Sequence, residues 1–310
     1  MIGETPALRA SIAGANDAGD WLRLKYQAGG EAVPADLSGD IERFLSEPPE
    51  VANNRFLVRL GAEPVACWAF VPAGTVLELR PFYITEGQVV AHGPSVVASV
   101  VKEAAGRGSA ITVEYPEAYS PLFTGAGFKQ NTRTCMKMPL STYEPRLVVL
   151  PAGIDMRHPR PEDQAAASEL AFRNYMGTAD AEMVSTSREQ ASNMMRAIFG
   201  SEYARFSPET SFLAEDGEGR LVGSVLVGDM TREPEQSIFW ILDISAAPEW
   251  RGKGLGKALL AASLNAAKGS GFSSIGLAVT IGNEPAHNLY RSYGFSDYGA
   301  LMYEAILMLD

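Results

Sequence analysis

The sequence contains few cysteines and few histidines, and this shortage excludes two classes of site. Its 310 residues include only Cys67 and Cys135, too few for a disulfide framework, and neither lies in a C-x-x-C motif. We therefore expect both thiols to be reduced and buried. The three histidines, His92, His158 and His287, are too few for a multi-histidine metal site, so no metal is expected.

Long apolar runs and an excess of positive charge are also missing. No apolar segment reaches the ~18 residues that cross a bilayer, and residues 1–6 lack the basic start and apolar block of a secretory leader. The 26 Lys and Arg residues against 37 Asp and Glu residues give a net charge of −11, which repels nucleic acid and anionic membranes. The sequence thus predicts a cytoplasmic protein without nucleic-acid or membrane partners. A homodimer is left open.

The length and composition suit two globular domains. A domain typically has roughly 100–200 residues, and the hydrophobic fraction of 46% allows each half to bury a core. Three prolines punctuate residues 139–153, which is typical of a linker or crossover. We place the boundary in this segment and predict domains at 1–145 and 146–310.

The two halves carry the same order of predicted elements. In the second half, strands at 211–215, 221–227 and 237–245 precede a helix at 257–268, a strand at 275–280, a helix that Asn283 caps and that runs to Tyr293, and a strand at 300–307. In the first half, strands at 55–60, 66–71 and 76–84 precede a helix at 95–105 and a strand at 111–114. Residues 122–128 and 289–295 both read Leu-aromatic-x-x-x-Gly-Phe, which indicates a duplication.

The segment 251–256 reads Arg-Gly-Lys-Gly-Leu-Gly and lies between a predicted strand and a predicted helix. Alternate glycines let the backbone approach a ligand closely, and the N-terminus of a helix attracts anions. The basic residues here add positive charge to an otherwise acidic chain. The segment therefore predicts a phosphate-binding loop.

Two common phosphate loops do not fit this segment. A Walker loop needs one more residue between Gly252 and Gly256, and Ala258 stands where its hydroxyl should be. The dinucleotide fingerprint requires a glycine where the chain has Lys257. The pattern that does fit is R-x-x-G-x-G.

This pattern, after a strand that leads into Ala-Pro-Glu-Trp, resembles the acetyl-CoA signature of the GNAT superfamily of N-acetyltransferases. Residues 283–295 resemble a second element of that family, N-x-x-A-x-x-L-Y-x-x-x-G-F. The resemblance covers residues 153–309 well and the first half weakly. It implies an α+β fold (α/β/α layers) of two GNAT-like domains, each a mixed, mainly antiparallel sheet flanked by helices. It also implies direct transfer of an acetyl group from acetyl-CoA, used as co-substrate, to a primary amine of a small molecule or peptide.

The resemblance assigns roles to particular residues. Tyr290 is the expected catalytic residue: it would protonate the departing thiolate after a deprotonated amine has attacked the thioester carbonyl, while a strand N–H polarises the oxyanion. Backbone groups of Ile244 and Ala246 would pair with the pantetheine arm, which Asn283 would also contact. The expected cofactor-binding residues are Ile244, Ala246, Arg251, Gly252, Lys253, Gly254, Leu255, Gly256, Lys257, Asn283, Ala286 and Tyr290.

The base that deprotonates the amine stays open. On a regular strand Trp240, Leu242 and Ile244 share one face and Asp243 points to the other, so no carboxylate stands where family members often carry Glu. Asp243, Glu284 and a water chain remain candidates. The alternative function is a non-enzymatic CoA-binding sensor or scaffold, in which Tyr290 merely packs its helix. The acceptor and the length of the acyl group also stay open, and mycothiol assembly is one candidate context.

The first half matches the family pattern poorly at the positions that carry chemistry. When residues 88–93 are aligned with 251–256, Ala91 replaces the first glycine and the basic residues are missing. Phe123 stands where the second half has Tyr290, so it offers no proton. We expect a degenerate, non-catalytic copy that has lost cofactor binding, covers the second domain and shapes the acceptor cleft.

Overall fold

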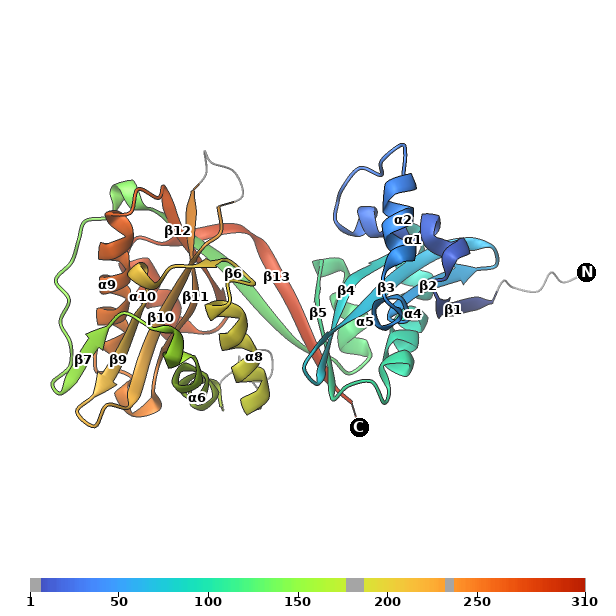
Figure 1. Cartoon of the computed structure of the whole chain (residues 1–310). Coiled ribbons are helices and arrows are strands. Elements are labelled where there is room, and N and C mark those ends of the chain that lie inside the picture. Colours follow the sequence, from blue (N-terminus) through green and yellow to red (C-terminus); the bar gives the residue numbers. More distant parts are fainter. Residues whose placement is uncertain (1–6, 177–186, 232–236, 310) are drawn as a thin grey trace, which may run out of the picture. The chain divides into compact units, whose positions relative to one another are not determined.

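The computed structural model describes residues 7–176, 187–231 and 237–309, so the opening segment 1–6 lies outside the described residues. The chain forms two compact units (Figure 1). The first contains Met1–Gln130 and Tyr303–Asp310, and the second contains Asn131–Met302. No helix among the described residues is long and apolar enough to cross a membrane.

The first unit is a sheet with helices on both faces. The sheet order is β1 (Leu8–Ile12), β2 (Arg55–Leu60), β3 (Glu63–Ala73), β4 (Val76–Ile84) and β5 (Ala110–Tyr115). One buried cluster joins α1 (Ala18–Ala28) and α2 (Ser38–Ser46) to Leu57 and Cys67 of the sheet. A second cluster joins α4 (Val89–Ala104) and α5 (Ser120–Gly125) to Phe56 and Trp68. Adjacent residues of one strand thus pack into different clusters, because successive side chains of a strand point to opposite faces of the sheet. The short α3 (Pro49–Ala52) precedes β2.

The second unit has the same layered architecture. Its sheet order is β13 (Ser296–Met308), β6 (Lys129–Pro139), β12 (Ser274–Thr280), β11 (Ile238–Ala246), β10 (Leu221–Asp229), β9 (Phe212–Asp216) and β7 (Ile154–Arg157), with β8 (Arg205–Phe206) beside β10. Helix α9 (Leu255–Lys268) packs on one face, where Leu259 approaches Gly223. Helices α6 (Gln164–Tyr175) and α8 (Arg188–Phe199) lie on the other face, and α10 (Glu284–Ser292) follows β12. The predicted α+β class is therefore confirmed.

Each unit is completed by a strand from the opposite half of the sequence. Residues 133–139 of β6 pair with β12 in the second unit, with Met138 opposite Ile275. The end of β13 pairs with β5 in the first unit, with Leu307 opposite Ile111. The compact units consequently change at 130/131 and 302/303 rather than at the predicted 145/146. The ladder partner of a strand is a long-range property, which the pattern of a single strand does not encode.

Most predicted elements lie where the pattern placed them. The strands at 55–60 and 76–84 are confirmed residue for residue, and α9 starts at Leu255 rather than 257. The helix predicted at 95–105 is wrong at its start, because α4 begins at Val89 and runs through Pro94. Proline cannot donate to the carbonyl one turn back, here that of Val90, whose side chain is 92% exposed.

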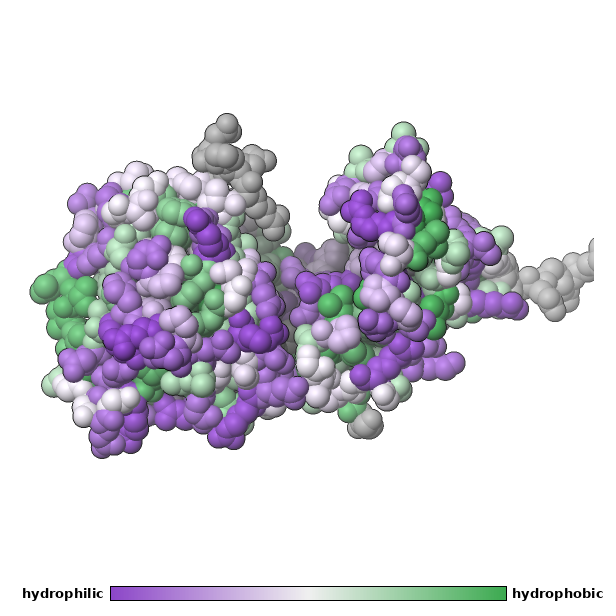
Figure 2. All heavy atoms as spheres, viewed as in Figure 1, coloured by the Kyte–Doolittle hydropathy of each residue, from purple (hydrophilic) through white to green (hydrophobic). Residues whose placement is uncertain are grey.

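The predicted burial of both cysteines holds only for Cys67. Cys135 is half-buried on β6, and its Sγ lies 3.5 Å from Met302 Sδ. Desolvation raises the pKa of the Cys67 thiol, which keeps it protonated. In Figure 2 most of the visible face of the second unit is hydrophilic, and hydrophobic residues gather over the segment before β7, where Leu147 and Val149 are exposed.

An ion-pair cluster fixes the start of α6, the helix that carries two residues of the site described below. Arg157 of β7 donates to both oxygens of Asp163 at 2.7 and 2.8 Å and to Glu215 at 2.6 Å. Asp163 also accepts from the N–H of Arg160 at 2.7 Å. The Arg157 guanidinium holds the pKa of the Asp163 carboxyl below its usual value.

We expect Asp163→Asn to lower the free energy of unfolding by about 2 kcal/mol at pH 7, because it breaks a largely buried, hydrogen-bonded pair. A depressed carboxyl pKa stabilises the fold above the unfolded value, about 3.9, and this contribution disappears as the pH falls through the folded value. The deficit should therefore shrink as the pH falls below the unfolded value of about 3.9. Urea unfolding at several pH values measures the deficit, and the exposed Asp155→Asn on β7, the strand that carries Arg157, is the control. Equal deficits at pH 7 and pH 3 would contradict the ion-pair explanation.

Candidate active site

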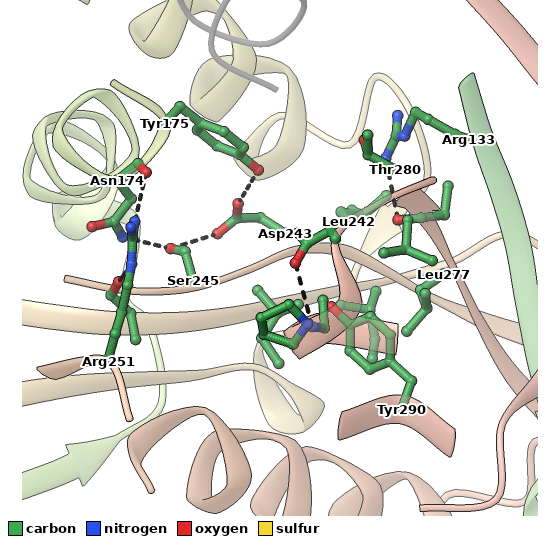
Figure 3. Close-up of a pocket in the computed structure, with 18 of the residues that line it drawn as sticks. Arg133, Asn174, Tyr175, Leu242, Asp243, Ser245, Arg251, Leu277, Thr280 and Tyr290 are labelled. Atoms are coloured by element: carbon green, nitrogen blue, oxygen red, sulfur yellow. Dashed lines mark hydrogen bonds between the residues drawn. The ribbon is translucent and has the colours of Figure 1, made fainter. Parts of the chain in front are cut away.

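The parallel strands β11 and β12 separate and leave a cavity between them. Residues 238–240 pair with 274–276, and the two strands have no further pairing beyond these positions. The cavity has a volume of about 500 Å³ and is lined by residues 241–246 of β11 and 277–280 of β12 (Figure 3). The rest of its lining is Arg133, Asn174, Tyr175, Arg251, Gly282, Asn283, Pro285, Ala286 and Tyr290. Six of the predicted cofactor residues thus meet here: Ile244, Ala246, Arg251, Asn283, Ala286 and Tyr290.

The backbone groups of Ile244 and Ala246 face this cavity. The N–H of Ala247 donates to the carbonyl of Val222 at 2.8 Å, which makes these two residues a hydrogen-bonded pair of the antiparallel ladder. Such pairs alternate with non-hydrogen-bonded pairs, so Ala246 and Ile244, opposite Gly223 and Val225, fall in the non-bonded class. Their N–H and C=O groups therefore point away from β10, toward the gap.

The glycine-rich loop connects β11 to α9. Gly252 and Gly254 have φ values of 73° and 90°, a region that favours glycine. Gly254 is the N-cap of α9 and offers no side-chain acceptor to the first N–H groups of this helix. These groups and the helix dipole provide a site for an anion. Gly256 lies in the first turn, and the side chain of Leu255 is buried, so only its backbone can contribute.

The basic residues of the loop are placed differently from one another. Lys253 Nζ lies 5.0 Å from the centroid of the Trp250 ring, and Lys257 is exposed on α9. Arg251 Nη2 donates to the carbonyl of Asn174 at 2.8 Å and its Nε to that of Ala246 at 3.2 Å. The Arg251 guanidinium therefore ties the end of β11 to α6 at the cavity wall, a connection that the loop motif did not predict.

Helix α10 brings two predicted residues to the cavity. Asn283 Oδ1 accepts from the N–H of Ala286 at 3.3 Å, which is the predicted N-cap bond. Ala286 and Tyr290 are four residues apart and share a helix face, and both line the cavity. Tyr290 is 6% exposed and its ring centroid lies 5.9 Å from that of Phe295. His287, on the same helix, is also buried.

A β-bulge at Leu242 overturns the predicted faces of β11. Asp243 pairs with Leu226 and Ile241 with Val227, so Leu242 is an extra residue without a partner. Trp240 lies opposite Gly228 and Ile244 opposite Val225. Directly opposite residues project to the same face, and positions 225 and 228 of β10 are on opposite faces.

It follows that Trp240 and Ile244 do not share a face, as a regular strand would require. Asp243 instead projects with Trp240, because their partners Leu226 and Gly228 are two residues apart. This is the α6 side of the sheet, where Tyr175 and Asn174 of that helix reach β11. The bulge thus brings the Asp243 carboxylate to the face from which the alternating pattern excluded it.

Asp243 is 3% exposed and accepts three hydrogen bonds from hydroxyl groups. Tyr175 donates to Oδ1 at 2.9 Å and Ser245 to Oδ2 at 3.4 Å (Figure 3). Ser224 of β10 also donates to Oδ2, at 2.8 Å. Burial raises the pKa of this carboxyl, and the three hydroxyl groups act in the opposite direction. None of these three partners was predicted from the sequence.

Sequence reasoning also missed Asn174 and Arg133, which line the cavity from α6 and β6. Neither residue belongs to a recognisable motif. The one available signal was Asp243 itself, since a carboxylate within an apolar strand requires polar partners from neighbouring elements. The identity of those partners depends on the packing of α6 and β10.

The first unit fills the equivalent gap with its own side chains. Strand β4 pairs with β5 only at residues 76–79, as β11 does with β12 at its start. The N–H of Thr85 donates to Val65, so Ile84, the last residue of β4, turns its backbone away from β3. Tyr119 Oη accepts from the Ile84 N–H at 3.1 Å and donates to its carbonyl at 3.0 Å.

The first unit also has no glycine loop at this place. Residues 85–88 alone separate β4 from α4, whereas residues 247–254 separate β11 from α9. The connection begins with Thr85 and Glu86, and it carries no basic residue. Both backbone groups of Ile84 are therefore bonded to Tyr119, and the segment lacks the features of an anion site.

A sheet that opens between two parallel strands, with an anion-binding loop after the first of them, defines an acetyltransferase-type domain of the GNAT fold. Residues 178–295 match the model of the acetyltransferase (GNAT) family. This match places a GNAT acetyltransferase domain in the second half of the chain.

Curated relatives support this assignment. The chain is 29% identical over 166 residues to a mycothiol acetyltransferase of Propionibacterium freudenreichii, in a match that covers 52% of this chain and 49% of the relative. It is 32% identical over 153 residues to a mycothiol acetyltransferase of Paenarthrobacter aurescens, covering 47% and 43%. N-alpha-acetyltransferase 30 of Schizosaccharomyces pombe is 32% identical over 94 residues, covering 30% and 62%. The chain spans about half the length of the mycothiol acetyltransferases it matches.

Solved structures extend the likeness in fold to the whole chain. A GCN5-related N-acetyltransferase from Sphaerobacter thermophilus has a TM-score of 0.57 at 16% identity and covers 97% of this chain and 95% of its own. A tandem GNAT protein from the clavulanic acid biosynthesis pathway has a TM-score of 0.53 at 19% identity, with coverage of 97% and 98%. The fold of this chain is thus that of two GNAT-like domains, as predicted.

Proposed function

We propose that this protein transfers an acetyl group directly from acetyl-CoA to a primary amine of a small molecule or peptide. The observation that carries the proposal is the cavity between β11 and β12, with the backbone groups of Ile244 and Ala246 turned into it. A glycine-rich loop and the uncapped N-terminus of α9 follow β11. A linear ligand with amide groups and a diphosphate suits this combination.

The residues fit acetyl-CoA as co-substrate. Ile244 and Ala246 would hold the pantetheine amides as an added strand does, and Ala286 and Asn283 would flank that arm. The N–H groups from Gly252 to Lys257, with Lys253 and Lys257, would hold the diphosphate.

Tyr290 supplies the proton that the leaving thiolate needs. Its side chain lines the cavity from α10, opposite the exposed backbone of β11. After the amine has attacked the carbonyl carbon, a strand N–H would stabilise the oxyanion and the Tyr290 phenol would protonate sulfur as the C–S bond breaks. No metal is required for these steps.

The acceptor class follows from charge and from the relatives. The chain carries a net charge of −11, which favours cationic amines over anionic ones. Several relatives are named mycothiol acetyltransferases, so amines that also carry a thiol form a reasonable first group to test. Polyamines, aminoglycosides and lysine side chains form the others.

The first domain, about residues 1–145 in the predicted division, acts as a degenerate structural copy in this proposal, and residues 146–310 carry the transferase. Tyr119 occupies the backbone groups of Ile84, and the linking segment 85–88 is short and lacks basic residues. The hydroxyl must be displaced before any ligand can bind there as a strand.

We therefore expect one acetyl-CoA site per chain. Isothermal titration of the full chain measures the stoichiometry, and release of free thiol in the presence of amines measures transfer. Tyr119→Phe should leave the acetyl-CoA affinity and the stoichiometry unchanged, while it lowers the free energy of unfolding by about 1–3 kcal/mol because the buried Ile84 N–H loses its partner.

Each other outcome has a separate meaning. Two sites per chain would contradict the structural role of the first domain. One site without turnover of any amine would favour a CoA-binding sensor or scaffold. No binding at all would contradict the proposed function as a whole.

A further inference from the structure

Asp243 is a buried carboxylate whose described partners are all neutral. Its two oxygens accept from the hydroxyl groups of Tyr175, Ser224 and Ser245, and no cation pairs with it among the residues that the structure describes. An ionised carboxylate in such a place is costly unless a positive charge joins it. Because Asp243 lines the cavity, a ligand can supply that charge.

Asn174 adds an acceptor atom to the same wall. The side chain is 4% exposed, its amide N–H donates to Ser245 at 2.9 Å, and its Oδ1 is buried without a hydrogen-bond partner in the part of the chain described. A buried carbonyl oxygen without a hydrogen-bond partner is unfavourable. A ligand that donates hydrogen bonds in this part of the cavity would remove that cost.

The two acceptors are connected through Ser245. Its hydroxyl receives the Asn174 Nδ2–H and donates to Asp243, so the carboxylate and the Asn174 amide group belong to one network on the α6 side (Figure 3). An alkylammonium group carries one positive charge and three N–H donors. It therefore matches what this wall lacks.

We propose that Asp243 and Asn174 form the binding site for the ammonium group of the acceptor, and that Asp243 takes the proton that this group must lose before transfer. The inference rests on the proposed acetyl transfer and names the class of its acceptor, a primary amine that enters as a cation. Asn174 accepts one N–H bond and orients the nitrogen.

The proton balance is as follows. The ammonium N–H bond breaks and its proton passes to Asp243, which leaves a lone pair on nitrogen. The nitrogen attacks the thioester carbonyl carbon, the C–S bond breaks, and the Tyr290 phenol protonates sulfur. The second proton on nitrogen restores the phenol, and Asp243 releases its proton to solvent. The products are an amide, a free thiol and one proton.

The surroundings of Asp243 suit a group that gains and loses a proton. Burial raises the pKa of the Asp243 carboxyl toward neutrality, which makes it a stronger base than an exposed carboxylate. The other charged or titratable groups of the lining are Arg133 on β6, Tyr175 on α6, Arg251 after β11 and Tyr290 on α10. Both arginines donate to backbone carbonyls.

The test measures kcat/KM against pH for the full chain with acetyl-CoA and four probe amines: spermidine, kanamycin, L-cysteinamide and a lysine-containing peptide. We expect Asp243→Asn to lower kcat/KM for the amine roughly 100- to 1,000-fold at pH 7 and to leave the acetyl-CoA affinity within about twofold. The remaining kcat/KM of this variant should rise with pH as the free amine loses its proton in solution. Asp155→Asn makes the same change on the exposed edge of β7 and should match the wild type.

Tyr175→Phe separates a catalytic from a structural role. The variant removes one donor to the ionised carboxylate, so the acid limb of the profile should move to higher pH while the rate at high pH is kept. Asn174→Ala should raise KM for the amine more than it lowers kcat. An Asp243→Asn enzyme that keeps its acid limb and its rate would overturn the inference and leave the proposed transfer standing. A wild-type chain that acetylates none of the amines would overturn both.

Discussion

Replacing Gly254 by glutamate is expected to weaken acetyl-CoA binding roughly 100-fold. The substitution disfavours the positive φ at this position, and it adds a negative charge at the N-terminus of α9. Gly254 has a φ of 90° and is the N-cap of α9, so any side chain there is strained. A carboxylate at this position would occupy the N–H groups that we assign to the diphosphate and would repel it. Isothermal titration with acetyl-CoA measures the loss.

Strain alone must be separated from the loss of the anion site. Gly219, in the exposed turn between β9 and β10, has a φ of 75° and open space around it, as Gly254 has. Gly219→Glu therefore imposes the same kind of backbone strain and the same charge away from the loop. Both variants should lower the thermal midpoint by a similar amount, but only Gly254→Glu should lose affinity. Equal acetyl-CoA affinities in the two variants would place the diphosphate elsewhere.

The features of this loop could be predicted from sequence because they are local. The positive φ values at Gly252 and Gly254, the start of α9 and the N-cap at Asn283 each depend on a few adjacent residues. The order of strands and helices in both units follows from apolar periods in the same way.

The features that complete the site are not local. The bulge at Leu242 appears only when β11 is paired with β10, and it moves Asp243 to the face of Trp240. The partners of Asp243 come from α6 and β10, and Arg133 reaches the cavity from β6. A strict alternation over residues 240–244 therefore predicted the wrong face for the one carboxylate of this strand.

The same distinction explains the first domain. The replacement of glycine by Ala91 and the presence of Phe123 indicated a copy without chemistry, and both are visible in the sequence. The hydrogen bonds between Tyr119 and the backbone of Ile84 cannot be predicted from the sequence, because the two residues are 35 positions apart. They meet only when β4 and the turn before α5 have folded. The sequence thus predicts that this copy lacks the chemistry, and the structure adds the two bonds between Tyr119 and Ile84.

Tyr290→Phe should lower kcat roughly 100- to 1,000-fold and leave the acetyl-CoA affinity within about twofold. The phenyl ring keeps the packing of a residue that is 6% exposed and lies near Phe295, so the fold and the binding site are retained. Only the proton for the thiolate is lost. Steady-state kinetics over pH 6–10 with the best probe amine measures the effect, and a rate equal to the wild type at every pH would exclude the proton-donor role.

The double variant with Asp243→Asn tests whether the two residues act in one sequence of proton transfers. Asp243 removes a proton from nitrogen and Tyr290 delivers one to sulfur, so each variant leaves a different step slow. If both proton transfers contribute to one rate-limiting transition state, the losses multiply. If the two residues act in separate steps, the slower step alone sets the rate, and the losses are less than multiplicative. The single variant that already shows the full loss then identifies the step that limits the rate.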